Sequence, residues 1–177
     1  MDIGSLHDVW VAVQVRSRYE FTTAEFLRYK GYETFVPTYR SKRQWSDRSK
    51  ELELPLFSGY IFCRFQDDVR GAILLTPGII RIVGTRKEVA RIDEREIQAL
   101  KCVVASRVPA MPHPFLNVGD RVRIMDGPVA GVEGIFLRHK GGDRLILSVQ
   151  LVQRSIELEL QGAQFALVAP EPERAAA

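Results

Sequence analysis

Basic and aromatic residues gather in one short stretch of the chain, YRSKRQWSDRSKE, residues 39–51. Five cationic residues surround Trp45 in it: Arg40, Lys42, Arg43, Arg48 and Lys50. Cationic side chains bind phosphates, and an indole ring can stack on an unpaired base. The last four cations are therefore candidate nucleic-acid contacts. The alternative is a solvated hairpin or loop whose charges only keep it soluble.

Residues that could perform catalysis or hold a metal are sparse. The histidines, His7, His113 and His139, lie in a tail, a linker and a loop by sequence pattern, without an acidic or cysteine partner arrangement nearby. Cys63 and Cys102 each lie inside an apolar run without metal-ligand spacing, which indicates buried thiols. No phosphate-loop pattern occurs. The sequence predicts a binding protein that is not an enzyme and uses no cofactor or metal.

Size and charge narrow the class of protein further. A chain of 177 residues with 46% hydrophobic and 27% charged residues suits one ordinary domain or two small ones. No apolar run is long enough for a membrane helix, and the first residues lack a signal-peptide pattern. We therefore expect a soluble cytoplasmic protein. Residues 1–109 contain 18 Lys and Arg against 14 Asp and Glu, a net charge of +4, whereas residues 110–177 have a net charge of −1.

Strand and helix patterns alternate over the first hundred residues. We expect strands over 9–15, 32–37, 59–65 and 79–84, and helices over 19–31, 68–75 and 92–104. Ser17 and Glu20 have capping-box spacing before the first helix, Phe21 is expected on its buried face with Ala24 and Leu27, and Gly31 is expected to end it. Asp67 is expected to cap the second helix, and Asp93 pairs with Glu96 at the start of the third. The simplest packing is a split βαβ sheet with the helices on one face.

The remaining residues predict a small β-domain behind a linker. Three prolines in ASRVPAMPHPF, residues 105–115, disfavour helix and regular strand and indicate an extended connection. Strand-period runs follow over 120–127, 132–139, 144–152 and 155–162, separated by glycine-containing breaks. Gly127, Gly131 and Gly134 are expected to serve the tight corners of a small barrel.

The order of these motifs resembles a known family. WVAVQV, FVP, LFSGYIF and TPGIIRIVG, followed by the KOW-like motif VGDRVRIMDGPVAGVEGIF at 118–136, are similar to the NusG-type transcription elongation and antitermination factors. The basic insert between FVP and LFSGY resembles the specialised RfaH-like paralogs. The resemblance implies an α+β fold: a ferredoxin-like split βαβ NGN domain over 7–105, a proline-rich linker over 106–115, an SH3-like KOW β-barrel over 116–170 and a disordered tail over 171–177.

The resemblance also implies a function. Members of the family bind the clamp helices of the largest subunit of bacterial RNA polymerase, hold the clamp closed and reduce pausing. The apolar patch that does so maps onto Phe57, Tyr60 and Phe62, which from the residues alone are also candidates for the core. Ser58 stands where the family usually has proline, so we expect a looser turn there.

Nucleic acid and a second protein are the other implied partners. Arg16 and Arg18 correspond to basic residues that specialised members use against the non-template DNA strand, and Lys42, Arg43, Arg48 and Lys50 are candidates for upstream duplex phosphates; ordinary surface charge is the alternative. The KOW barrel would recruit a ribosomal protein or Rho through Val152 and Ile156, although Val152 replaces a family aromatic. We expect a monomer. The rival hypothesis, a KOW-type RNA-binding protein of ribosome assembly or structure, predicts a basic barrel, which the charge of −1 does not favour.

Overall fold

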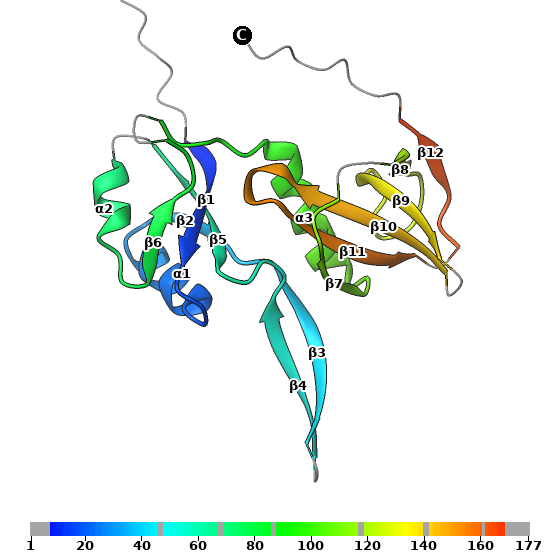
Figure 1. The fold of residues 1–177 in the computed structure, drawn as a ribbon, viewed down its shortest axis with the longest axis horizontal. Coiled ribbons are helices and arrows are strands. Elements are labelled where there is room, and N and C mark those ends of the chain that lie inside the picture. Colours follow the sequence, from blue (N-terminus) through cyan, green and yellow to red (C-terminus); the bar gives the residue numbers. More distant parts are fainter. Residues whose placement is uncertain are drawn as a thin grey trace, which may run out of the picture. The chain divides into compact units, whose positions relative to one another are not determined.

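The computed structural model describes residues 8–45, 48–66, 69–85, 88–116, 119–139, 142–160 and 162–168 (Figure 1). The chain divides into two compact units. The first contains the residues up to Lys101 together with Val149–Gln153, and the second contains Cys102–Ser148 and the residues from Arg154 onward.

The first unit is built on a four-stranded antiparallel sheet. Its strands are β1 (Val9–Val15), β2 (Glu33–Phe35), β5 (Tyr60–Phe65) and β6 (Ile79–Ile82), in the order β2-β5-β1-β6. Since β5 runs antiparallel to both neighbours, β1 and β2 are parallel strands with β5 inserted between them. The helix α1 (Glu20–Tyr29) connects β1 to β2, and α2 (Arg70–Leu74) lies between β5 and β6. This is the predicted split βαβ arrangement.

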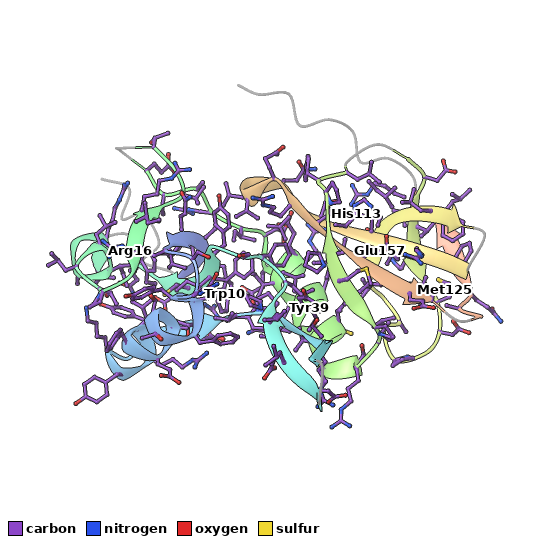
Figure 2. All side chains as sticks on the ribbon, turned by 60° about the horizontal axis from the view of Figure 1, so that its bottom comes forward. Trp10, Arg16, Tyr39, His113, Met125 and Glu157 are labelled. Carbon is purple, nitrogen blue, oxygen red and sulfur yellow. The ribbon has the colours of Figure 1, made fainter. Side chains whose placement is uncertain are left out.

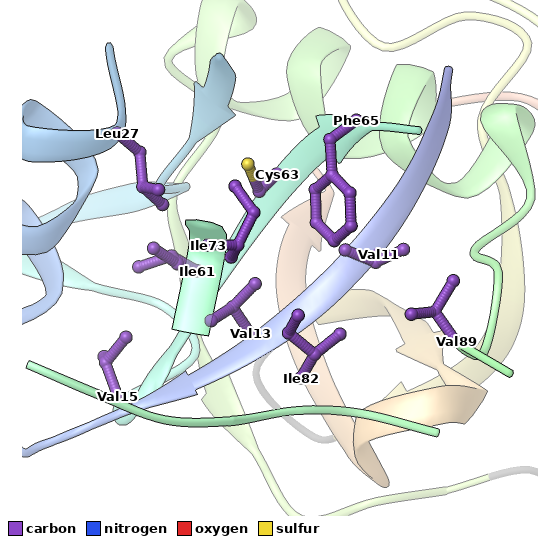
Figure 3. Packing of buried hydrophobic residues seen from close by; sticks show 10 residues of the cluster. All are labelled: Val11, Val13, Val15, Leu27, Ile61, Cys63, Phe65, Ile73, Ile82 and Val89. Atoms are coloured by element: carbon purple, nitrogen blue, oxygen red, sulfur yellow. The ribbon is translucent and has the colours of Figure 1, made fainter. Parts of the chain in front are cut away.

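One face of this sheet forms a hydrophobic core with α1 and α2. The β-branched residues at alternate positions of β1, Val11, Val13 and Val15, are buried beside Ile61 and other residues of β5. Leu27 of α1 and Ile73 of α2 belong to the same cluster (Figure 3). The two-residue period of the strands thus places the smaller apolar side chains under these two helices.

The opposite face of the sheet is also covered, which corrects the prediction that all helices lie on one face. The third helix, α3 (Glu94–Ser106), places the Nζ atom of Lys101 at 4.7 Å from the centre of the Trp10 ring. Trp10 precedes Val11 in β1 and therefore belongs to the other face. The sequence contained a sign of this second covered face, because Trp10 and Phe62 are large apolar residues that alternation places on it. In the structure both are fully buried.

The first helix ends as predicted but begins differently. Gly31 has φ +92°, and the N–H groups of Gly31 and Tyr32 donate to the carbonyls of Arg28 and Leu27, which closes the helix. The predicted capping box is wrong, because Tyr19 occupies the N-cap position without a side-chain cap and Glu20 accepts a hydrogen bond from elsewhere. Phe21 is also misassigned, since it is an exposed residue.

The first turn of α3 contains a carboxyl group with an unusual proton affinity. Burial, and next the negative charge of Asp93, raise the pKa of Glu96 to about 7. Because an unfolded chain gives a glutamate its ordinary pKa of about 4.3, the folded protein binds the proton more tightly and loses stability as the pH rises from about 4 to 7.

We therefore expect Glu96→Gln to stabilise the protein at pH 8 relative to wild type, and to do so less at pH 5, where Glu96 is already protonated in the folded state. Urea unfolding at the two pH values measures this difference. A gain in unfolding free energy that is the same at both pH values would contradict the assignment.

A long β-hairpin interrupts the fold between β2 and β5. The strands β3 (Thr38–Trp45) and β4 (Arg48–Pro55) form their own two-stranded sheet, which projects from the four-stranded sheet (Figure 1). The N–H of Leu56 donates to the carbonyl of Pro37 at 2.9 Å and closes the stem. The basic stretch, expected as a nucleic-acid contact or as a solvated hairpin or loop, thus has the backbone of a hairpin.

The second unit is a six-stranded sheet in the order β12-β8-β9-β10-β11-β7. The four expected strands are present as β8 (Arg121–Ile124), β9 (Glu133–His139), β10 (Gly142–Val149) and β11 (Arg154–Leu160). The short 3-10 helix that precedes β11 in the sequence, Gln150–Val152, is grouped with the first unit. Two further strands, β7 (Ala110–His113) and β12 (Phe165–Leu167), form its edges. The predicted fold class, α+β with a small β-domain at the C-terminal side, is confirmed.

The strand β7 lies inside the segment that the prolines led us to expect as an extended linker. It pairs with β11 in antiparallel register, with Pro112 opposite Ile156. The N–H of Glu159 donates to the carbonyl of Pro109, so the hydrogen-bonded pairs fall at 109, 111 and 113. Pro112 therefore occupies a position whose backbone groups face away from β11, and its missing donor removes no bond from this pairing.

Candidate functional site

A tight turn precedes β5 and presents Tyr60. The N–H of Tyr60 donates to the carbonyl of Phe57 at 3.0 Å, and Gly59 has φ +82°, the conformation that a type II turn requires at its third position. The N–H of Gly59 donates to the carboxylate of Glu20 at 2.8 Å, and its carbonyl accepts from the N–H of Val15. Glu20 itself is only 2% exposed. Hydrogen bonds on both sides therefore fix this turn, although Ser58 stands where a proline would stiffen it.

The three residues of the predicted apolar patch are together, but their exposure differs. Phe57 is 1% and Phe62 0% exposed, and their rings meet edge to face with centroids 5.5 Å apart. Phe35 adds a further ring at 6.3 Å from Phe62. Tyr60 is half-buried. The structure thus makes Phe57 and Phe62 a buried support and leaves Tyr60 as the member of the patch with accessible surface.

The sheet face that carries Tyr60 continues into polar residues. Tyr60 lies opposite Gln14 in the register of β5 and β1, and Gln14 lies opposite Arg81 of β6. The Nε of exposed Arg81 donates to the side-chain oxygen of Gln14 at 2.7 Å. An aromatic residue beside a hydrogen-bonded polar pair is a typical composition for the margin of a protein interface.

An ion-pair group on the same face was missed by the sequence analysis. Lys101 Nζ lies 3.0 Å from Glu33, and Arg64 lies 3.6 Å from the other carboxylate oxygen of Glu33. Residues so far apart in sequence give no local signal. One feature of the sequence does indicate an ion pair of Lys101. This residue lies four positions after Ile97, on the apolar stripe of its helix, where a cation needs a charged partner.

Arg16 and Arg18 lie in the connection between β1 and α1, and both are exposed (Figure 2 labels Arg16). The N–H of Arg16 donates to the carbonyl of Gly78 at 2.8 Å, which ties this connection to the one between α2 and β6. Arg18 has φ 68°, a left-handed conformation that is uncommon for a side chain of its size. Two exposed cations on an anchored loop can bind phosphate.

The remaining nucleic-acid candidates are in the hairpin, away from Arg16 in the sequence. Lys42 and Arg43 belong to β3, and Arg48 and Lys50 belong to β4. In the ladder Lys42 lies opposite Glu51, whereas Arg43 lies opposite Lys50. The four residues therefore do not share one face of the hairpin.

Both predicted partner-binding residues are buried: Val152, which is grouped with the first unit, is 6% exposed, and Ile156 in β11 is 0% exposed. The exposed large apolar side chains described in the second unit are Met111, Met125 and Leu167. A hollow of about 390 Å³ also lies in this unit. It is lined by residues 106–109 at the end of α3 and after it, by the turn at 126–129, by Glu159 and Leu160 at the end of β11, and by residues 162 and 163.

The cysteines and His113 are the other side chains that could take part in chemistry. Burial raises the pKa of the Cys63 thiol to about 12, whereas Cys102 is half-buried. His113 lies in β7 with Nε2 3.9 Å from Glu157 (Figure 2), an acidic neighbour that its sequence context did not show. Within the described ranges no group of three or more His, Cys, Asp or Glu residues could hold a metal ion. No described helix has the length and apolar character needed to cross a membrane. His7, Asp67 and the expected tail over 171–177 lie outside the described residues.

The family model described as "Transcription termination factor nusG" matches residues 8–101 of this chain. The chain belongs to the NusG family. A relative named "Transcription termination/antitermination protein NusG" from Lactococcus lactis is 27% identical over 173 residues, covering 90% of this chain and 92% of the relative. The protein of the same name from Vibrio vulnificus is 27% identical over 171 residues, covering 88% and 93%.

A solved structure titled "Domain interaction in Thermotoga maritima NusG" matches the fold with a TM-score of 0.54 and 19% identity, over 89% of this chain and 95% of that one. The predicted resemblance to NusG-type factors is thus confirmed. As a NusG-family protein, the chain is a bacterial-type transcription termination/antitermination factor.

Proposed function

We propose that this NusG-family protein binds bacterial RNA polymerase through a surface centred on Tyr60, at the clamp helices of the largest subunit, and reduces pausing by holding the clamp closed. The observation that carries the proposal is the half-buried Tyr60 at the end of a turn fixed by Glu20. An aromatic side chain on a pre-organised backbone loses little entropy on binding and is a common interface anchor. Phe57 and Phe62 act from beneath as its support, and Gln14 and Arg81 supply a polar margin.

The test compares full-length wild type with Tyr60→Ala on a purified bacterial elongation complex, measuring affinity and pause duration in the same samples. We expect Tyr60→Ala to weaken binding at least about tenfold, equivalent to about 1.4 kcal/mol, and to lengthen pauses accordingly. Tyr29→Ala is the matched control, because Tyr29 on α1 is 94% exposed. It should leave both readouts unchanged.

Two results would refute the polymerase proposal: no binding by folded wild type, or equal binding by wild type and a folded Tyr60→Ala variant. In the first case structured RNA is the next ligand to test, as the rival hypothesis of a ribosome-associated RNA-binding protein requires.

We further propose that Arg16 and Arg18 contact the non-template DNA strand in that complex. Support comes from their exposure and from the hydrogen bond that anchors their loop to Gly78. Guanidinium groups can both pair with phosphate and stack on a base.

The β-domain is proposed to recruit a second partner. Because Val152 and Ile156 are buried, exposed Met125 and Leu167 and the hollow beside Pro128 are the more accessible parts of this unit for such a contact. Tethering two binding units in one chain raises the effective concentration of one partner near the other.

A further inference from the structure

The register of the β3–β4 hairpin sorts its charged residues onto two different faces. Residues directly opposite each other in an antiparallel ladder share a face, and successive residues alternate between faces. Four cross-strand pairs therefore form one face and four form the other. The first face contains the pairs Thr38–Pro55, Arg40–Glu53, Lys42–Glu51 and Gln44–Ser49; the second contains Tyr39–Leu54, Ser41–Leu52, Arg43–Lys50 and Trp45–Arg48.

Charges on the first face are balanced. Arg40 lies opposite Glu53 and Lys42 opposite Glu51, so each cation has a carboxylate directly across the ladder. Glu53 also accepts a hydrogen bond from the Thr38 hydroxyl at 2.6 Å. Opposite-charge pairs of this kind stabilise a two-stranded ribbon. The first face needs no external ligand to account for its composition.

The second face has a different composition at each end. Toward the stem it carries Tyr39, Leu52 and Leu54, which are half-buried. Toward the tip it carries the positions of Arg43, Trp45, Arg48 and Lys50, three cationic residues and an indole without an acidic residue among them. Arg43 and Lys50 are directly opposite each other, an arrangement that destabilises an isolated ribbon.

We propose that this tip face, defined by Arg43, Trp45, Arg48 and Lys50, is a binding site for single-stranded nucleic acid, and that Lys42 is not part of it. A polyanion binds favourably where two cationic residues occupy directly opposite positions of a ladder, and this gives a reason for the like-charge pair of Arg43 and Lys50. The ligand is single-stranded because a base can stack on an indole only where it is unpaired.

The proposal rests on the proposed function, since it deepens the nucleic-acid contact expected of a protein at a transcription complex. It differs from the expectation based on sequence, which treated Lys42, Arg43, Arg48 and Lys50 alike, because it includes Arg43 in the binding site and excludes its neighbour Lys42. Lys42 and Arg43 are adjacent and both cationic, yet the ladder gives the first a glutamate and the second a lysine as its partner.

The experiment measures fluorescence anisotropy of labelled oligonucleotides of about 20 nucleotides, as single-stranded DNA, single-stranded RNA and duplex DNA, with full-length protein at several salt concentrations. We expect Arg43→Gln and Lys50→Gln each to weaken single-strand binding about fivefold. Each should also reduce the slope of log affinity against log salt concentration by about one. Lys42→Gln, the matched control, should weaken it less than about twofold. Trp45→Ala should weaken binding of single strands but not of duplex.

A thermal melt of the free variants adds a second readout. Arg43→Gln should melt no earlier than wild type, because it removes a repulsive pair, so lost binding cannot be assigned to lost folding. Equal losses for Lys42→Gln and Arg43→Gln, or tighter binding of duplex than of single strands, would overturn the proposal. Because no polymerase is present, such a result leaves the role of Tyr60 intact, and Tyr60→Ala should bind the oligonucleotides as wild type does.

Discussion

Replacing Phe62 with alanine should lower the free energy of unfolding of the first unit by about 3–5 kcal/mol. The Phe62 ring is 0% exposed and contacts Phe57 edge to face, with Phe35 nearby. Removing it takes away buried apolar surface and leaves a cavity that the neighbouring strands β1 and β2 and the turn at Phe57 cannot readily fill. Urea unfolding of the full-length protein, followed by circular dichroism, measures the loss.

Phe26→Ala is the matched control, because Phe26 on α1 is 43% exposed and should cost about 1 kcal/mol or less. The comparison matters for function as well. If Phe62→Ala abolishes polymerase binding only to the extent that it unfolds the protein, Phe62 is a support for Tyr60. A destabilisation as small as that of Phe26→Ala would contradict this and return Phe62 to the interface.

Replacing Gly134 with alanine should destabilise the β-domain by about 1–3 kcal/mol or more. A Cβ atom at this position would lie 2.5 Å from the carbonyl oxygen of Ile146 and 2.9 Å from the Leu145 side chain. The first neighbour is backbone of the adjacent strand β10 and cannot move without shifting the ladder between β9 and β10. Thermal unfolding monitored by strand circular dichroism measures the effect.

The control for this substitution is Gly71→Ala in α2, where the added Cβ meets no atom within 4 Å. That change should be neutral or stabilising, because alanine has the higher helix propensity. If Gly134→Ala also proves neutral, β9 and β10 are not in the close approach seen here. A loss of stability would explain the glycine at position 134 of the KOW-like motif by the close approach of β10, and a neutral result would remove that explanation.

Much of the fold follows from local patterns in the sequence. The buried run VWVAVQV, the alternation in GYIFCRF and the glycine after YEFTTAEFLRYK correctly predict β1, β5 and α1 with its end at Gly31. Periodicity works here because each of these segments is long enough to show one face. The three residues of β12 are too few to display a period, and it was missed.

Other features depend on contacts between distant residues. Glu20 has the spacing of a capping residue, but its carboxylate binds the N–H of Gly59, 39 residues away, and no local rule reveals that competition. For the candidate site, alternation correctly grouped Tyr60 with Phe62. Their different exposure depends on Phe35 and on the turn at Phe57, which the sequence could not place beside them.

Pro112 has a consequence beyond the pairing of β7 with β11. An edge strand with free N–H and carbonyl groups can template the addition of a strand from another molecule, which is how folded β-proteins begin to aggregate. On β7 the outward-facing backbone groups belong to Ala110 and Pro112, and proline offers no N–H to an incoming strand. Pro112, one of the prolines from which we expected no regular strand, thus protects this edge of the sheet against the addition of a strand from another molecule.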